Sequence, residues 1–130
     1  MKIEIAYPPN IEKIKERFDL GNRTVVFTYG DTLYNPSGVT IPDHLIVHEQ
    51  THTKQQADPV AWWDRYLEDD AFRLSQELEA YRNQYKFVKG TVNNKNIAFS
   101  FLLSVSKDLS SELYGNIISM NDAVKKIENL

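Results

Sequence analysis

The segment His48-Glu49-Gln50-Thr51-His52 constrains this chain more than any other part of its sequence. On an α-helix, which turns by about 100° per residue, the two histidines lie on one face, one turn apart. Two imidazoles in this arrangement can supply two of the nitrogen ligands that a Zn²⁺ ion takes. Glu49 is the neighbour of His48, and we expect it on the same side of the helix, where it can accept a proton from water at the ion. The segment therefore predicts a helix that carries part of a zinc site, with a third ligand from elsewhere.

Composition limits how the chain can hold such an ion and what it can bind. With 130 residues it is long enough for one domain with one core, so we expect residues 1–130 to form a single domain. It has no cysteine, so nitrogen and oxygen must hold the metal. A net charge of −3 gives no basic surface for nucleic acid. The sequence shows neither a signal peptide nor an apolar run that could cross a membrane, so a cytoplasmic or virion-associated protein with no membrane partner is expected.

The part of the chain before the motif shows strand patterns. Apolar and charged residues alternate at the N-terminus, and β-branched and aromatic residues dominate the segment before Gly30. Asn10 can cap a short helix over residues 11–18. We expect a small antiparallel sheet, built from strands over residues 1–6, 24–29, 32–34 and 39–41.

Helices are predicted from the motif onwards. Asp43 is a good N-cap for the motif helix, which should run from His44 to about Gln56. Gly90 is expected to end the longest helix, and Ser119 to cap the last one. Further helical segments are expected over residues 60–67, 71–89, 97–106, 109–114 and 119–127. The first of these segments carries three aromatic residues, Trp62, Trp63 and Tyr66, which we expect in the core or in a groove wall. The fold class is therefore α+β, a small antiparallel sheet packed on a helical bundle.

The predicted helix over residues 71–89 offers two glutamates as the third ligand. Its apolar positions fall within one stripe, and Glu77 lies at the edge of that stripe. Glu79 lies on the opposite side, among polar residues. A buried carboxylate needs a partner, which a metal ion would provide, so Glu77 is the better ligand, with Glu79 kept as the alternative. His44 precedes His48 by one turn and would have to span two turns to the same ion, so we expect it at the surface or in support of a ligand.

Together, the motif at 48–52 and the later segment Glu77-Leu78-Glu79-Ala80-Tyr81 resemble the gluzincin metallopeptidases. The likeness is to minimal single-domain members with an E-x-E-A motif on a second helix, and it covers roughly residues 24–90. It implies a zincin-like fold in which His48, His52 and Glu77 bind zinc. The stretches Tyr-Gly-Asp and Tyr-Asn-Pro-Ser-Gly are similar to segments of small phage-encoded proteins with this motif. Many relatives carry Asp four residues after the ligand, where it orients a histidine, whereas this chain has Tyr81.

The resemblance implies hydrolysis of peptide bonds in a peptide or protein substrate. A zinc-activated water would attack the carbonyl, and Glu49 would act as general base and return the proton to the leaving amine. An extended substrate would pair with an edge strand near Leu33-Tyr34 or Val39–Ile41. A second electrophile often assists, and the sequence offers three candidates without ranking them, Tyr66, Tyr81 and Tyr114.

Two other functions compete with this hypothesis. The chain could be a structural or assembly protein, for example in a virion, that keeps the zincin fold and the zinc and binds other copies or assembly partners. It could also be a metal-free helical binding module. The presence of Glu49 favours the enzyme, because a structural site has no need of a general base.

Overall fold

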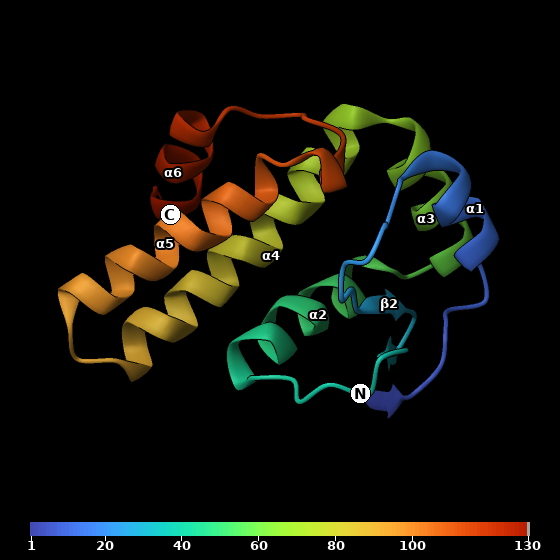
Figure 1. The fold of residues 1–130 in the computed structure, drawn as a ribbon, viewed down its shortest axis with the longest axis horizontal. Helices are drawn as coiled ribbons and strands as arrows, with labels where there is room; N and C mark the ends of the chain where they lie inside the picture. Colours follow the sequence, from blue (N-terminus) through green and yellow to red (C-terminus); the bar gives the residue numbers. More distant parts are fainter. Residues whose placement is uncertain (130) are drawn as a thin grey trace.

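In the computed structural model, which describes residues 1–129, the chain forms an α+β fold with the sheet on one side of the helices (Figure 1). The predicted fold class is confirmed at this level. The helices, with one 3₁₀ turn η1, are α1 (Ile11–Arg17), α2 (Asp43–Gln55), α3 (Pro59–Glu68), α4 (Asp70–Thr91), α5 (Lys95–Leu109), η1 (Glu112–Tyr114) and α6 (Met120–Glu128). No helix within residues 1–129 is long and apolar enough to span a membrane.

The sheet has three short strands, β1 (Lys2–Glu4), β2 (Phe27–Tyr29) and β3 (Thr32–Tyr34), in the order β1-β3-β2. β2 and β3 are antiparallel because a tight turn joins them, in which Gly30 has a φ of +63°. β1 pairs in parallel with β3, since the chain between them crosses over through α1 and β2. The prediction of a purely antiparallel sheet was therefore wrong. The strand expected over residues 39–41 is also absent, because the chain turns there towards α2.

Several helix ends differ from the sequence prediction: α5 is longer at both ends than the predicted 97–106, the segment predicted over 109–114 forms only η1, and two predicted end residues have other roles. Asp43 is the first residue of α2 rather than its cap, a position that Pro42 occupies. α4 continues through Gly90 to Thr91, where the Thr91 hydroxyl donates to the carbonyl of Phe87. The carbonyl of Val88 accepts the N–H of Val92, and Gly90 is not left-handed. The predicted cap of α6 is confirmed, since the Ser119 side chain accepts the N–H of Asp122.

The core consists of two clusters on either side of the motif helix. The first joins α4, α5 and α6, and the second packs α1, β2 and α3 around Trp62 and Trp63. α4 contributes a stripe with the helical spacing that the sequence predicts, formed by Leu78, Tyr81, Tyr85 and Val88. α2 lies against α4 on one side and β2 on the other, and this packing places the motif between the sheet and the longest helix (Figure 1).

Candidate metal centre

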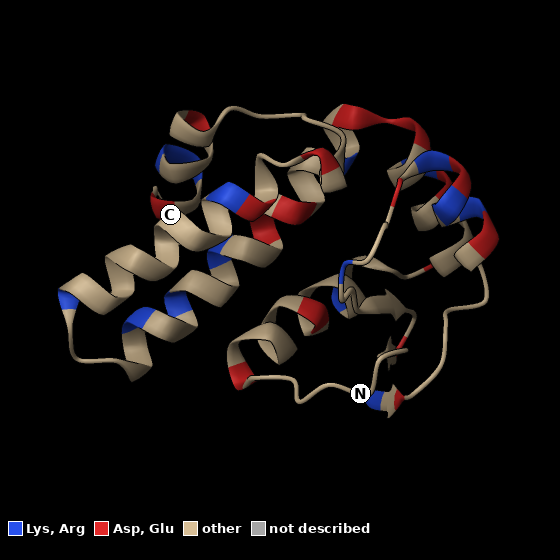
Figure 2. Cartoon of the chain, in the orientation of Figure 1, with Lys and Arg blue, Asp and Glu red and all other residues tan. Residues whose placement is uncertain are grey.

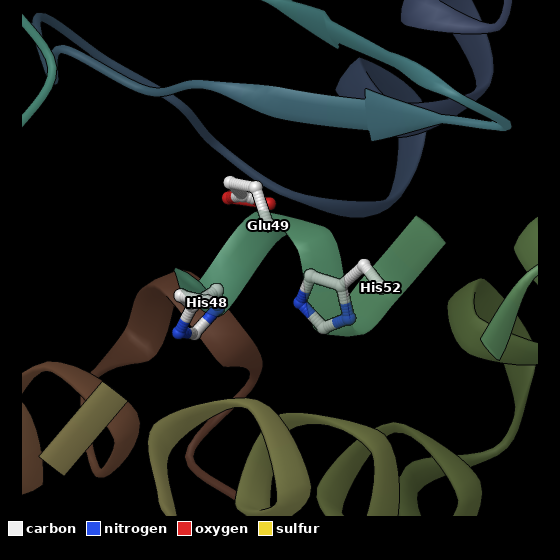
Figure 3. Close-up of side chains that lie close together, drawn as sticks. All are labelled: His48, Glu49 and His52. Atoms are coloured by element: carbon white, nitrogen blue, oxygen red, sulfur yellow. The ribbon is translucent and has the colours of Figure 1, made fainter. Parts of the chain in front are cut away.

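The motif helix α2 buries all three of its chemically active side chains. His48, Glu49 and His52 are 3%, 6% and 5% exposed. Both imidazoles point from α2 towards α4, whereas Glu49 points to the other side, towards the sheet (Figure 3). The sequence predicts Glu49 on the same side of the helix as His48. In the structure Glu49 lies on a different side of α2, although it stays close to both histidines. One ligand atom from each of the three residues lies within 4.8 Å of the others, so this buried group could hold a metal ion.

Glu77 of α4 faces the two histidines. Its Oε1 atom is 3.1 Å from Nε2 of His48 and 3.2 Å from Nε2 of His52, and its side chain is buried. Glu79 lies on the exposed side of α4, where its carboxylate accepts a hydrogen bond from Gln55. The structure thus brings Glu77 into the cluster and leaves Glu79 at the surface.

The distances between these atoms suit a small tetrahedral ion. Ligand atoms at about 2.0–2.1 Å from such an ion are about 3.3 Å from one another. The separations between Glu77 Oε1 and the two Nε2 atoms are close to this value. Two imidazoles and a carboxylate form a nitrogen and oxygen donor set that suits zinc and other first-row divalent metals. By these two separations, one ion could bind Oε1 of Glu77 and either Nε2 atom at ordinary ligand distances.

Two glutamine amides set the orientation of the imidazoles. His48 Nδ1 lies 2.9 Å from Oε1 of Gln84, and His52 Nδ1 lies 2.8 Å from Oε1 of Gln55. The Gln55 amide nitrogen donates to the backbone carbonyl of Gln76, which fixes which end of that amide faces His52. Because an amide oxygen only accepts, each Nδ1 must carry the hydrogen in its bond. Both Nε2 atoms are then left to face Glu77, as metal binding requires.

Neither glutamine was predicted from the sequence. Gln84 follows Glu77 by seven residues, two turns of α4, which would have placed it on the same face. Tyr81, four residues after Glu77, contacts His48 but does not bond it. Its ring packs edge-on against His48, with the ring centres 4.5 Å apart, but its hydroxyl bonds the Tyr114 hydroxyl at 2.7 Å. His44 lies behind the site, as expected, where its Nδ1 accepts the Gln84 amide N–H.

Tyr66 of α3 holds the other oxygen of Glu77. Its hydroxyl donates to Glu77 Oε2 at 2.6 Å. Burial and the neighbouring Glu77 carboxylate raise the pKa of Tyr66 well above its usual value, so the phenol keeps the proton that it donates. Since Tyr66 occupies Oε2, the carboxylate presents Oε1 alone to the histidines.

His52 and Glu77 are electrostatically coupled. Burial alone would lower the pKa of His52, but the Glu77 carboxylate outweighs it and raises this pKa to about 9. Burial would raise the pKa of Glu77, yet the two histidines hold it well below its usual range. In the absence of metal, protonated His52 thus supplies the positive charge beside the Glu77 carboxylate.

Glu49 is held against the sheet by Thr28 of β2. The Thr28 hydroxyl donates to Glu49 Oε2 at 2.8 Å. This bond comes from an element far from the motif in sequence, and it directs the carboxylate away from Glu77. Glu49 and Glu77 therefore each have one oxygen held by a hydroxyl group, but Glu49 lies on the side of the imidazoles that faces the sheet.

A small cavity and a larger groove adjoin the cluster. The cavity has a volume of about 70 Å³ and is lined by His48, Glu49, His52 and Glu77 together with apolar side chains. The groove has a volume of about 510 Å³ and also reaches His48 and Glu49. Leu113 and Tyr114 of η1 line both spaces, so this short turn forms part of the wall between them.

Replacing Gln84 with Leu is expected to weaken the binding of a metal ion, with Zn²⁺ as the probe, about 10- to 100-fold, because His48 loses the acceptor that orients its ring. Gln84→Glu keeps an acceptor at the same place and should retain affinity near that of the wild type. Competition with a coloured chelator would measure both. Equal zinc affinity in Gln84→Leu and wild type would show that the amide does not position His48.

Comparison of this chain with models of protein families, with curated proteins and with solved structures finds no match. Fold, burial and donor geometry are therefore the observations on which a function can be argued. They define a buried histidine and carboxylate cluster beside an open groove.

Proposed function

We propose that this protein is a zinc-dependent peptidase of the gluzincin type, with His48, His52 and Glu77 as metal ligands and Glu49 as general base. The observation that carries the proposal is the convergence of both Nε2 atoms on one oxygen of Glu77, while Glu49 stays close but is tied to Thr28. Two histidines and one acid on the ion leave a position open for water and substrate, which is the pattern of catalytic zinc sites.

The ion, when bound, would supply Lewis acidity that polarises the substrate carbonyl and acidifies water. Glu49 accepts the proton of the attacking water and delivers it to the leaving amine. Gln84 and Gln55 keep the imidazoles in the orientation that binding requires, and Tyr66 keeps Glu77 presenting a single oxygen.

Among the three candidate tyrosines, Tyr114 is the best placed to donate to a substrate carbonyl oxygen. Its side chain lines both the cavity and the groove, whereas the Tyr66 hydroxyl is committed to Glu77. Burial raises the pKa of Tyr114 well above its usual value, so its hydroxyl stays a donor. Tyr81, bonded to the Tyr114 hydroxyl, would help to orient it.

The groove suggests a different path for the substrate from the one expected from the sequence. Leu33-Tyr34 lies on β3, the central strand, and residues 39–41 form no strand, so neither offers a free edge. The segment 24–26 lines the groove and lies outside the β2–β3 pairing. We therefore propose that an extended peptide runs along residues 24–26 and reaches Glu49 from the groove.

One observation favours a second candidate, a structural or assembly protein with a permanently bound ion. The cluster is deeply buried and Glu49 lies within reach of the histidines, so Glu49 could be a fourth ligand instead of a base. Structural zinc sites have four protein ligands and no open position. In this alternative the ion would join α2 to α4 and no hydrolysis would occur.

Metal content and hydrolysis measured on the same preparations test the proposal. Elemental mass spectrometry of untagged protein should find one zinc per chain, lost in Glu77→Gln and kept in Glu79→Gln, because only Glu77 faces the histidines. The same samples are then given a peptide mixture of diverse sequence, with cleavage followed by mass spectrometry. Chelation should stop cleavage and zinc should restore it. Protein that takes up no zinc, even when zinc is added, would refute the proposal.

A further inference from the structure

The sheet has one closed edge and one open edge. At β2, the carbonyl of Thr28 accepts hydrogen bonds from the side chains of Gln56 and Trp63, and Gln56 also accepts the N–H of Gly30. These side chains occupy the position that a further strand would take. β1 forms the other edge, and all three of its residues are exposed. Within residues 1–129, β1 is therefore the edge at which the sheet can be extended.

The hydrogen bonds of β1 show which backbone groups are free. The Lys2 N–H donates to the carbonyl of Asp31, and the Glu4 carbonyl accepts from the N–H of Asn35, so both residues direct their backbone towards β3. Backbone groups alternate in direction along a strand. The N–H and C=O of Ile3 consequently point outwards, away from β3.

Exposed apolar side chains accompany this open edge. Met1, Ile3 and Ile5 are 44%, 53% and 76% exposed, and they alternate with the charged residues Lys2 and Glu4. Figure 2 shows a basic and an acidic segment on β1, in blue and red, close to the N-terminus. An edge that combines free backbone groups with exposed apolar side chains favours pairing with another strand.

The pattern Met1-Lys2-Ile3-Glu4-Ile5 is complementary to itself when two copies run antiparallel. With Ile3 opposite Ile3, each Lys2 lies opposite the Glu4 of the second copy, and each Met1 lies opposite Ile5. The outward N–H and C=O of each Ile3 then bond those of its counterpart, as in a hydrogen-bonded antiparallel pair. Charges at an edge often prevent pairing, but here they are placed symmetrically and attract.

We propose that β1 is a self-association surface, at which a second copy of this chain pairs about a two-fold axis that passes between the two Ile3 residues. The two three-stranded sheets then form one continuous sheet with the order β2-β3-β1-β1-β3-β2. The inference depends on the backbone and charge pattern of β1 and holds whether or not the metal centre is catalytic. A C₂ contact of this kind uses the same patch on both copies, so it closes after two.

Charge exchange tests this register without disturbing the fold, because Lys2 and Glu4 are both exposed. Lys2→Glu and Glu4→Lys each place like charges opposite one another and should lower the association constant at least tenfold. The double variant restores complementarity and should recover association. Mixing the two single variants should give a heterodimer. Lys95→Glu, at the exposed start of α5, makes the same charge change away from β1 and should behave as wild type.

Sedimentation velocity on the 130-residue chain without a tag, from micromolar to millimolar concentration, provides the measurement. Circular dichroism of each variant checks that the fold is kept. A wild-type chain that stays monomeric throughout would overturn the proposal, and so would a dimer that both single variants leave intact.

A cysteine crosslink gives a second, independent test of the register, since the natural chain has no cysteine. Facing Cα atoms in a hydrogen-bonded antiparallel pair are about 5.5 Å apart, within the range of a disulfide. Ile3→Cys should therefore form a covalent dimer on mild oxidation. Ile5→Cys should not, because its two copies would lie roughly 13 Å apart along the strands. Equal crosslinking of the two variants would exclude the proposed register.

Discussion

Replacing Glu49 with Gln is expected to abolish peptide hydrolysis and leave one zinc bound per chain. The amide keeps the size of the side chain and can still bond Thr28, but it cannot accept the proton of the attacking water. Loss of a general base typically costs a factor of about 10²–10⁴ in rate. Hydrolysis of the peptide mixture and elemental mass spectrometry on the same sample would measure both results.

The same variant separates the enzyme from the structural alternative. If Glu49 is a fourth ligand, Glu49→Gln should lose zinc or bind it far more weakly, and it should lower the unfolding temperature. Glu79→Gln is the matched control, because it makes the same chemical change at an exposed position of α4 and should alter neither property. Loss of zinc from Glu49→Gln would therefore contradict the general-base assignment.

Helical periodicity accounts for the parts of the site that the sequence could predict. The interval of four residues between His48 and His52 set both imidazoles on one face of α2, and the apolar stripe of α4 placed Glu77 near the core and Glu79 in solvent. Both inferences use only residues within one helix. At that range the geometry of the α-helix determines which side chains share a face.

The rest of the site depends on contacts between elements far apart in the sequence. Thr28 reaches Glu49 from the sheet, and Tyr66 reaches Glu77 from α3. Local patterns cannot show which hydroxyl will face which carboxylate, because that depends on how the elements pack. The parallel pairing of β1 was missed for the same reason, since it depends on the path of the chain through α1 and β2.

Without metal, the protein is expected to lose stability as the pH rises from about 6.5 to 9. The Glu77 carboxylate raises the pKa of His52 to about 9 in the folded state, against 6.5 for a free histidine. Because the folded state binds this proton more tightly, its contribution is complete below pH 6.5 and is lost as the pH passes 9. The difference in pKa corresponds to about 3 kcal/mol.

Other groups act outside this window. The pKa of Glu77 is held below its usual value, so its contribution is present above pH 4.5 and is lost on acidification. Burial lowers the pKa of His44, which places its effect below pH 6.5, and the buried tyrosines titrate above pH 10. The fall in stability between pH 6.5 and 9 is therefore expected from His52, and removing the Glu77 charge tests this assignment.

Zinc should remove this fall, because the ion takes the place of the proton beside Glu77 and its binding releases that proton. Urea unfolding at pH 6, 7.5 and 9, with chelator and with zinc, would measure the two profiles. Glu77→Gln removes the charge that raises the pKa of His52, so its metal-free profile should be flat over the same range. A flat profile for the metal-free wild type would show instead that His52 carries no proton at neutral pH, and that the two histidines and Glu77 are not coupled as their distances indicate.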